Sequence, residues 1–230
     1  MKQLRTKAII LRRTDYGEAD RILTLLTPDF GKLSLIAKGV RRSKSKLAGG
    51  IELFSVSDIG FIQGRGAIGT LVSTQLITHY ATIVEHVDRT MLGYDLIAIL
   101  HKATEDELEP AYFELLEQTF GALNNPTIDA VLVRIWFAMQ LLRLGGQAPN
   151  LAFDTSGSRL TPDVTYEFSY DDMAFSPRAG GIFGASEIKF LRVGFAGTSP
   201  EIIQKITGLD TLLDISLPLL NTMSQMYLRS

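Results

Sequence analysis

The segment from Lys32 to Ile51 reads "KLSLIAKGVRRSKSKLAGGI" and combines two kinds of chemistry. Its beginning, "KLSLIAKGV", is rich in apolar residues and is typical of a β-strand. The part that follows carries positive charges without any acidic residue between them. These charges belong to Lys38, Arg41, Arg42, Lys44 and Lys46. A further strand-like run, "ELFSV", begins directly after Ile51, so the pattern predicts a cationic loop between two strands.

Other short segments before residue 80 share this strand-like composition. They are "KAIILRR", "RILTLLT", "ELFSVSDIGFI" and "IGTLVSTQLIT", and turn sequences such as "TDYGEAD" and "TPDFG" separate them. Five strands in about 75 residues, without an intervening helical pattern, are typical of a small closed or partly closed β-barrel. Closure would also remove exposed sheet edges. The cationic loop then joins the third and fourth strands of the barrel.

Beyond residue 80 the apolar residues repeat at helical spacing in three successive segments. The stripe of the first segment consists of Ile83, Val84, Val87, Met91, Tyr94, Ile97 and Ala98. The second segment begins at Pro110. The third, "NNPTIDAVLVRIWFAMQLLRLGG", is expected to start at Pro126 with Asn125 as its N-cap and to end at Gly145. Since this third segment is apolar nearly all round, we expect it to be the buried centre of a helical bundle.

The helical signal fades between about residues 149 and 184, where turn residues and short aromatic runs predict a small β-ribbon. Helices return after this ribbon. Thr198 is expected to cap one of them, and Pro218 to start the last one. The predicted fold class is therefore α+β. A β-barrel domain would occupy residues 1–80, and a helical domain with the ribbon insertion would occupy residues 81–230.

The charge of the chain is unevenly distributed along its 230 residues. The net charge is −2, yet residues 1–80 contain 13 basic and 6 acidic residues, whereas residues 81–230 contain 10 and 19. The first part therefore has a charge of +7 and the second a charge of −9. Such an asymmetry is typical of a protein of which one part binds a polyanion. A solvated surface without a partner is the alternative.

Several classes of site are excluded or unsupported by the sequence. The chain has no cysteine, which excludes disulfides, thiol catalysis and thiolate metal sites. The spacing of the three histidines does not form a metal-binding pair, and no nucleophile motif or P-loop is present. We therefore expect no cofactor, no metal and no catalytic residue. Without a signal peptide or a membrane-spanning segment, a cytoplasmic location is expected.

One glycine pattern suggests a nucleotide site, but its context does not fit. "GRGAIG", from Gly64 to Gly69, matches the dinucleotide-binding pattern G-x-G-x-x-G. That pattern requires a following helix, whose N-terminus faces the pyrophosphate. Here "TLVSTQLIT" follows, and its β-branched residues favour a strand. We therefore predict a hairpin turn between the last two strands of the barrel.

A cationic loop beside a barrel is similar to the electrostatic funnels of proteins that bind single-stranded nucleic acid. Aromatic residues that could stack on bases are scarce in this region, so phosphate contacts should dominate and binding should depend little on base sequence. Arginines of the barrel region could extend the basic surface. The candidate DNA-binding residues are Arg12, Arg13, Arg21, Lys38, Arg41, Arg42, Lys44, Lys46 and Arg65.

Arg134 lies in the third helical segment and has apolar neighbours on its own face. Those neighbours are Ala130, Val131, Phe137 and Ala138. A guanidinium group in such surroundings requires a carboxylate. This carboxylate could belong to another helix of the protein, or to a partner that docks in the bidentate geometry arginine favours.

The segment "TDYGEADRILTLLTPDFGKLSLIAKGVRRSKSKLAGGIELFSVSDI" resembles the N-terminal half of the RecO family of bacterial recombination mediators. The shared features are the "YGEAD" turn, the T-x-x-x-G-K turn from Thr27 to Lys32, the run "AKGVRRSKS" and the "LFS" that follows. "LLRLGGQAPNL" and "FSPRAGGI" resemble C-terminal landmarks of the same family.

The resemblance implies an OB-fold barrel followed by a helical domain. It implies binding of single- and double-stranded DNA, annealing of complementary strands, a nucleoid-associated location, and loading of RecA with RecR onto DNA coated by single-stranded-DNA-binding protein. In some members the acidic C-terminal tail of that coating protein docks on the helical domain, and Arg134 lies in the helix where this contact would be sought. An RNA-binding OB-fold protein without a recombination role is the alternative.

The sequence departs from many RecO family members in one respect. Those members hold zinc with two cysteine pairs around the segments that here read "LAFDTSG" and "IFGASE". This chain has no cysteine in either segment, so the resemblance does not extend to the zinc site. Aromatic residues of "TYEFSYDDMAF" are available to pack the ribbon instead.

Overall fold

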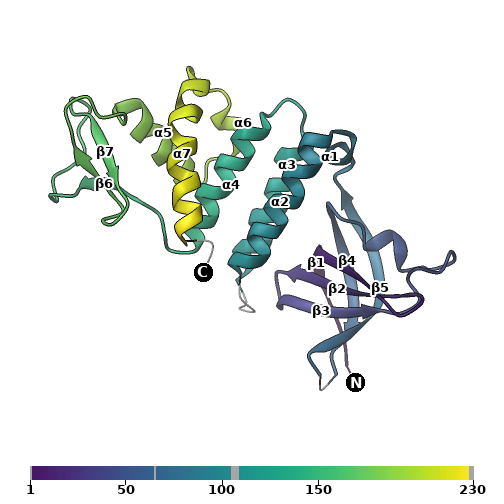
Figure 1. The fold of residues 1–230 in the computed structure, drawn as a ribbon. Helices are drawn as coiled ribbons and strands as arrows, with labels where there is room; N and C mark the ends of the chain where they lie inside the picture. Colours follow the sequence, from purple (N-terminus) through teal and green to yellow (C-terminus); the bar gives the residue numbers. More distant parts are fainter. Residues whose placement is uncertain (1, 65, 105–108, 228–230) are drawn as a thin grey trace. The chain divides into compact units, whose positions relative to one another are not determined.

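The computed structural model describes residues 2–64, 66–104 and 109–227 (Figure 1). The chain divides into two compact units, Met1–Asn125 and Pro126–Ser230. The first unit contains the predicted β-barrel together with helices, and the second contains helices and a small sheet. This confirms the predicted α+β class. The boundary between the units lies after the third helix, well beyond the change from strands to helices near residue 80.

Five strands of the described part of the first unit close into a barrel. They are β1 (Gln3–Tyr16), β2 (Asp20–Thr27), β3 (Gly31–Ala37), β4 (Ser55–Ile62) and β5 (Ile68–His79). Their order around the barrel is β1-β2-β3-β5-β4; β3 and β5 pair in parallel and the other neighbours are antiparallel. Alternate apolar side chains, among them Leu23, Leu25 and Phe61, fill the interior. This arrangement is that of an OB-fold.

Helices α1 (Ala81–Glu85), α2 (Val87–Ala103) and α3 (Pro110–Asn124) belong to the same unit, in which α2 contacts β1 and α3 contacts β2. Phe54, directly before β4, connects the helices to the barrel. Its ring meets those of Tyr94 and Phe120 edge to face, with centroid distances of 5.3 and 5.5 Å. Gly93 leaves the necessary space, because a Cβ atom there would lie 2.5 Å from the Phe54 ring. Barrel and helices therefore share a core.

The apolar stripe that the sequence shows at helical spacing on α1 and α2 is exposed at most of its residues. Val87, Met91 and Tyr94 are 81%, 58% and 46% exposed. The buried side of α2 instead consists of Arg89, Gly93, Leu96, Ile97 and Leu100. Two sets of residues at helical spacing on α2 could face the core. The set that is buried places the small Gly93 against Phe54 and the cation of Arg89 at the end of α3.

That cation is Arg89, which is only 7% exposed. Its guanidinium donates to the carbonyl oxygens of Leu123 and Asn125, at 2.8 and 3.2 Å. The last carbonyls of a helix have no partner within the helix, and a cation is favourable there. Arg89 therefore stabilises the C-terminus of α3, which explains why a charged residue lies on the buried face of α2.

The second unit is built around α4 (Ala130–Leu144), which contacts three other helices. They are α5 (Ala185–Phe195), α6 (Pro200–Ile203) and α7 (Leu209–Tyr227). Most of α4 is buried, which confirms its predicted central position. The indole N–H of Trp136, the only tryptophan of the chain, donates to the carbonyl of Thr198 at 2.9 Å.

The predicted starts of these helices require correction. α4 begins at Ala130, because the carboxylate of Asp129 accepts the N–H of Val131 at 2.7 Å and so forms the N-cap; Asn125 instead ends α3. α6 has Ser199 as its N-cap, without a side-chain hydrogen bond, so Thr198 does not cap it.

Pro218 does not start the last helix but lies inside α7. Proline lacks the N–H that would bond to the carbonyl of Asp214. Both residues are exposed, so water can satisfy this carbonyl.

The predicted β-ribbon lies between α4 and α5 as a three-stranded sheet. Its strands are β6 (Asn150–Asp154), β7 (Tyr166–Ser169) and β8 (Ala174–Pro177), in the order β6-β8-β7. Phe175 is fully buried, and its ring packs against those of Tyr166, Phe168 and Phe183. Aromatic packing thus supplies the core of this small sheet, a question that the sequence left open.

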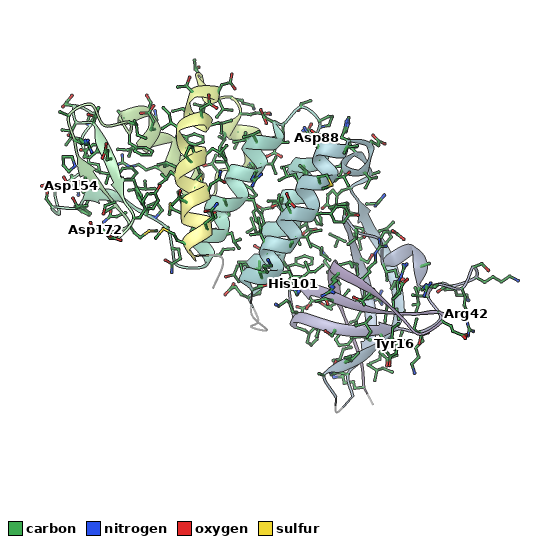
Figure 2. The ribbon with its side chains drawn as sticks, in the orientation of Figure 1. Tyr16, Arg42, Asp88, His101, Asp154 and Asp172 are labelled. Atoms are coloured by element: carbon green, nitrogen blue, oxygen red, sulfur yellow. The ribbon has the colours of Figure 1, made fainter. Side chains whose placement is uncertain are left out.

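A carboxylate closes the first loop of the ribbon. One oxygen of Asp154 accepts the N–H groups of Ser156 and Ser158 at 2.8 and 2.9 Å, and the Ser156 hydroxyl at 2.7 Å. Figure 2 shows Asp154 within the ribbon. The hydrogen bond from Ser156, with those from the backbone, lowers the pKa of Asp154. Among the described residues, no cluster of three or more acidic or histidine side chains could hold a metal ion there.

None of the helices in the described ranges has the length and apolar character required to cross a membrane.

Candidate nucleic-acid interface

The cationic loop, residues 38–46, lies between β3 and β4 as predicted. Its base is fixed to the hairpin of β1 and β2. The N–H of Gly39 donates to the carboxylate of Asp20 at 2.7 Å, and the N–H of Arg41 donates to the carbonyl of Ala19 at 2.9 Å. Gly39 has a φ of 64°, a conformation that glycine adopts without steric cost. Asp20, the last residue of "YGEAD", therefore positions the start of the loop.

The chain that leaves the loop is fixed to the barrel as well. The hydroxyl of Thr74 in β5 donates to the carbonyl of Leu47 at 3.2 Å. A short 3-10 helix, η1 (Ala48–Gly50), then contacts β4 and β5. With both ends held, the residues from Arg42 to Lys46 form an exposed tip. Figure 2 shows Arg42 on this part of the chain, which extends from the barrel.

Five candidate residues present free cations. Each is exposed, and its side chain makes no hydrogen bond or ion pair with any residue that the structure describes. They are Arg12, Lys38, Arg42, Lys44 and Lys46. Four of the five lie in the cationic loop. A backbone phosphate could therefore bind them without first displacing an acidic side chain of the protein.

The other three described candidates are paired with acids of the barrel region. The guanidinium of Arg13 lies 3.0 Å from the carboxylate of Glu52. Those of Arg21 and Arg41 lie 2.8 and 3.5 Å from the two oxygens of Asp15. Both acids are more than half exposed, at 54% and 53%. Ion pairs exposed to solvent contribute little to stability, so they can exchange for a phosphate. Arg65 lies outside the described residues.

The acidic residues of the first unit are concentrated in its helical part. Residues 81–125 contain 2 basic and 9 acidic residues, against 13 and 6 in residues 1–80. Within the described ranges, no ion pair connects the cationic loop with helices α1–α3. The helices therefore do not neutralise the loop, which remains available to an external polyanion.

Lys32, the last residue of the T-x-x-x-G-K motif, has a structural role instead. Its ammonium group donates to the carbonyl of His101 at 3.2 Å and to that of Thr104. It therefore satisfies the C-terminal end of α2, where a cation is favourable. Within the same motif, the Thr27 hydroxyl accepts the N–H of Phe30 and donates to the carbonyl of Gly31. Sequence reasoning missed these roles; a lysine within an apolar strand was the only signal.

The glycine pattern "GRGAIG" is not followed by a helix. Gly64 and Gly66 lie between the antiparallel strands β4 and β5, and Gly69 lies in β5 itself. The predicted hairpin is confirmed, and the structural requirement of the nucleotide-binding motif is not met. Gly69 is needed for strand packing, because a Cβ atom there would lie 2.8 Å from the Leu35 side chain.

Arg134 lies on an exposed position of α4, beside Val131, which is 44% exposed. Its side chain makes no hydrogen bond or ion pair with any residue in the described ranges. The described residues therefore offer no acidic partner for an internal ion pair of Arg134. The guanidinium group is accessible to a carboxylate from outside.

The chain matches two family models. The model described as "Recombination protein O N terminal" matches residues 1–80, and "Recombination protein O C terminal" matches residues 86–192. A DNA repair protein RecO of Dehalococcoides mccartyi is 37% identical over 180 residues, which are 77% of this chain and 67% of the relative. The chain belongs to the RecO family.

More distant RecO relatives agree with this assignment. A DNA repair protein RecO of Halalkalibacterium halodurans is 32% identical over 172 residues, 74% of this chain and 66% of the relative. One of Rubrobacter xylanophilus is 32% identical over 181 residues, 79% of this chain and 70% of the relative. The motifs that carry the resemblance to the RecO family have physical explanations here. "YGEAD" holds the start of the loop, and T-x-x-x-G-K turns the chain from β2 into β3 and holds the end of α2. "AKGVRRSKS" supplies three of the five free cations.

Proposed function

We propose that this RecO family protein acts in DNA repair and recombination as a DNA-binding and strand-annealing protein without enzymatic activity. Residues 1–80 would form the nucleic-acid-binding domain. Residues 81–230 would form a docking platform for partner proteins. The relatives named DNA repair protein RecO support the repair role, and the free cations of the OB-fold barrel support the binding of nucleic acid.

The observation that carries this proposal is the exposed tip of the cationic loop. Arg42, Lys44 and Lys46 are held outside the barrel by anchors at both ends of the loop, and none of their side chains has a partner among the described residues. Cations so placed bind backbone phosphates and release the counterions condensed on the nucleic acid. By neutralising phosphates of two strands, the loop would lower their mutual repulsion and allow complementary bases to pair.

The test is charge reversal of Arg41, Arg42, Lys44 and Lys46 to glutamate. We expect the affinity for single-stranded DNA at moderate salt to fall at least about 100-fold, and annealing to be lost. Fluorescence anisotropy of a labelled oligonucleotide and a strand-annealing assay measure the two effects.

The matched control reverses the same number of charges elsewhere, at Lys102, Arg159, Lys189 and Lys205, which are all exposed. It should change affinity much less, because these residues lie outside the barrel and its loop. Thermal unfolding must show that both variants are folded. Unchanged affinity of the loop variant would contradict the proposal. A much higher affinity for RNA than for DNA oligonucleotides would favour an RNA-binding function instead.

We further propose that the protein assists the loading of RecA, together with RecR, on DNA coated by single-stranded-DNA-binding protein. The accessible guanidinium of Arg134 would receive an acidic C-terminal tail of that coating protein. A pull-down with an acidic-tailed peptide tests this contact, and Arg134→Ala should abolish most of the binding. Arg143→Ala, on an exposed residue of the same helix, is the matched control. Equal binding by wild type and Arg134→Ala would contradict the contact.

A further inference from the structure

Asp15 lies between two arginines that come from different parts of the barrel region. In the hairpin of β1 and β2 it is directly opposite Arg21, whose Nε donates to one carboxylate oxygen at 2.8 Å. The other oxygen lies 3.5 Å from Nε of Arg41 in the cationic loop. One anion thus bridges two guanidinium groups, each about one third exposed. A backbone phosphate carries the same charge and offers oxygens of the same kind.

The backbone positions of the two arginines do not depend on Asp15. Arg21 lies at the start of β2 and pairs there with Ala37 of β3. Arg41 is held by its own backbone, whose N–H donates to the carbonyl of Ala19. The neighbouring Gly39 is bound to Asp20. If the Asp15 carboxylate left, both backbones would therefore stay in place, and the two guanidinium groups could still reach a common anion.

From this geometry we infer that Arg21 and Arg41 form a subsite for one DNA phosphate, that Asp15 fills this subsite in the free protein, and that the phosphate displaces it. The inference rests on the proposed binding of DNA by the cationic loop. The exposed ion pairs are weak enough to exchange, and the free cations of Arg42, Lys44 and Lys46 can hold the strand while the exchange occurs.

Asp15 is then an internal competitor of the nucleic acid. Each phosphate that enters the subsite must replace a carboxylate, so the net gain in interaction is smaller than for the free cations. A strand can therefore leave this subsite more easily than it would leave an uncompensated arginine pair. Such reversible contact suits a protein that brings strands together and then releases the duplex.

The experiment compares Asp15→Asn with Asp58→Asn in the full chain. Asp58 also forms an exposed ion pair at 2.8 Å, with Arg5 of β1, so both variants add one net positive charge and free one or more guanidinium groups. By anisotropy with a labelled oligo-dT strand, Asp15→Asn should bind about fivefold or more tightly than wild type. Asp58→Asn should change affinity less than about twofold, because Arg5 is not part of the subsite.

The salt dependence and a second substitution separate competition from a merely structural role. For Asp15→Asn the slope of log K against log salt should stay close to that of the wild type, because the same phosphate is neutralised in both proteins once Asp15 has been displaced. Arg41→Gln should weaken binding more in the Asp15→Asn protein than in wild type. Equal effects of Arg41→Gln in both, equal affinities of the two asparagine variants, or weaker binding by Asp15→Asn would each overturn the inference.

A measurement on the wild type keeps the test independent of the fold of the variants. In labelled protein, saturating oligo-dT should shift the Nε–H resonance of Arg21 and leave that of Arg5 unchanged. An unchanged Arg21 resonance at saturation would refute the subsite. The outcomes for the proposed function are distinct: if reversal of the loop charges leaves DNA binding intact, the function itself fails. If only the Asp15 predictions fail, the function stands and the subsite does not.

Discussion

The cationic loop and the β6–β8 ribbon are both turn-rich segments between regular elements, but they use their polar groups in opposite ways. In the ribbon, the carboxylate of Asp154 accepts hydrogen bonds from the backbone, and the aromatic rings around Phe175 bury one another. In the loop, hydrogen bonds hold the backbone, at both ends and in the turn between them, and the side-chain charges of Arg42 and Lys44 remain free. Polar groups that are hydrogen-bonded within the chain indicate a structural role. Charged side chains that remain without a partner on an anchored loop indicate a role in binding another molecule.

The largest expected effect separates these two regions. Phe175→Ala should destabilise the second unit by about 3–5 kcal/mol, because a fully buried ring is lost from a small core. Chemical denaturation, followed by the fluorescence of Trp136 in the same unit, measures this loss. Under native conditions the affinity for DNA should stay within about twofold of wild type. A strong loss of DNA binding by the folded variant would contradict the claim that the ribbon has a structural role and the loop a binding role.

Two lysines provide a sharper version of the same comparison. Lys32→Met removes the donor to the carbonyls at the end of α2 and should cost about 1.5–3 kcal/mol of stability. Lys44→Met should change stability by less than about 0.5 kcal/mol, since the side chain is exposed and unpaired in the described structure, and it should weaken DNA binding. Thermal unfolding and anisotropy titrations distinguish the variants. A larger loss of stability for Lys44→Met than for Lys32→Met, or a larger loss of DNA affinity for Lys32→Met, would contradict the assigned roles.

A smaller effect is expected at the base of the loop. Gly39→Ala places a side chain at a φ of 64°, which should cost about 1–2 kcal/mol. The strain would loosen the anchor to Asp20 and weaken DNA binding moderately. Gly49→Ala is the matched control, because a Cβ atom there meets nothing within 4 Å and its φ is not in the left-handed region. Identical melting temperatures for the two variants would show that an alanine at position 39 is not strained.

The smallest effect concerns the pH dependence of the ribbon. The pKa of Asp154 is lowered below its ordinary value of 3.8, first by the Ser156 hydrogen bond. Its contribution to stability is therefore fully present above that ordinary value and is lost as pH falls through the lower pKa of the folded state. Melting curves of wild type and Asp154→Asn should differ at pH 6 and converge as the carboxylate is protonated. A difference that persists unchanged in acid would contradict this role.

Features that depend on local chemistry could be predicted from the sequence. The five strands, the loop between β3 and β4, and the buried position of α4 follow from composition and period. Features that depend on distant partners could not. The buried side of α2 is decided by Phe54, and the cations of Arg89 and Lys32 are fixed by carbonyls at the ends of other helices.

The same limit applies to the candidate interface. The sequence identifies the basic residues, but it does not show which of them are already paired. Arg13, Arg21 and Arg41 look like Arg42 or Lys46 in the sequence, and only the register of the hairpin and the loop brings them to Glu52 and Asp15. The predicted start of α4 was wrong for a related reason. Asp129 was a better N-cap than Asn125, and the two positions are separated by only a few residues.

The salt dependence of DNA binding tests the central claim most directly, because it counts the phosphates that the protein neutralises. If about five phosphates of a single strand are neutralised, log K of the wild type should fall with log salt at a slope of roughly −3 to −4. In the variant with Arg41, Arg42, Lys44 and Lys46 reversed, the slope should become shallower than about −1. Equal slopes for wild type and variant would contradict the claim that the cationic loop binds the DNA backbone.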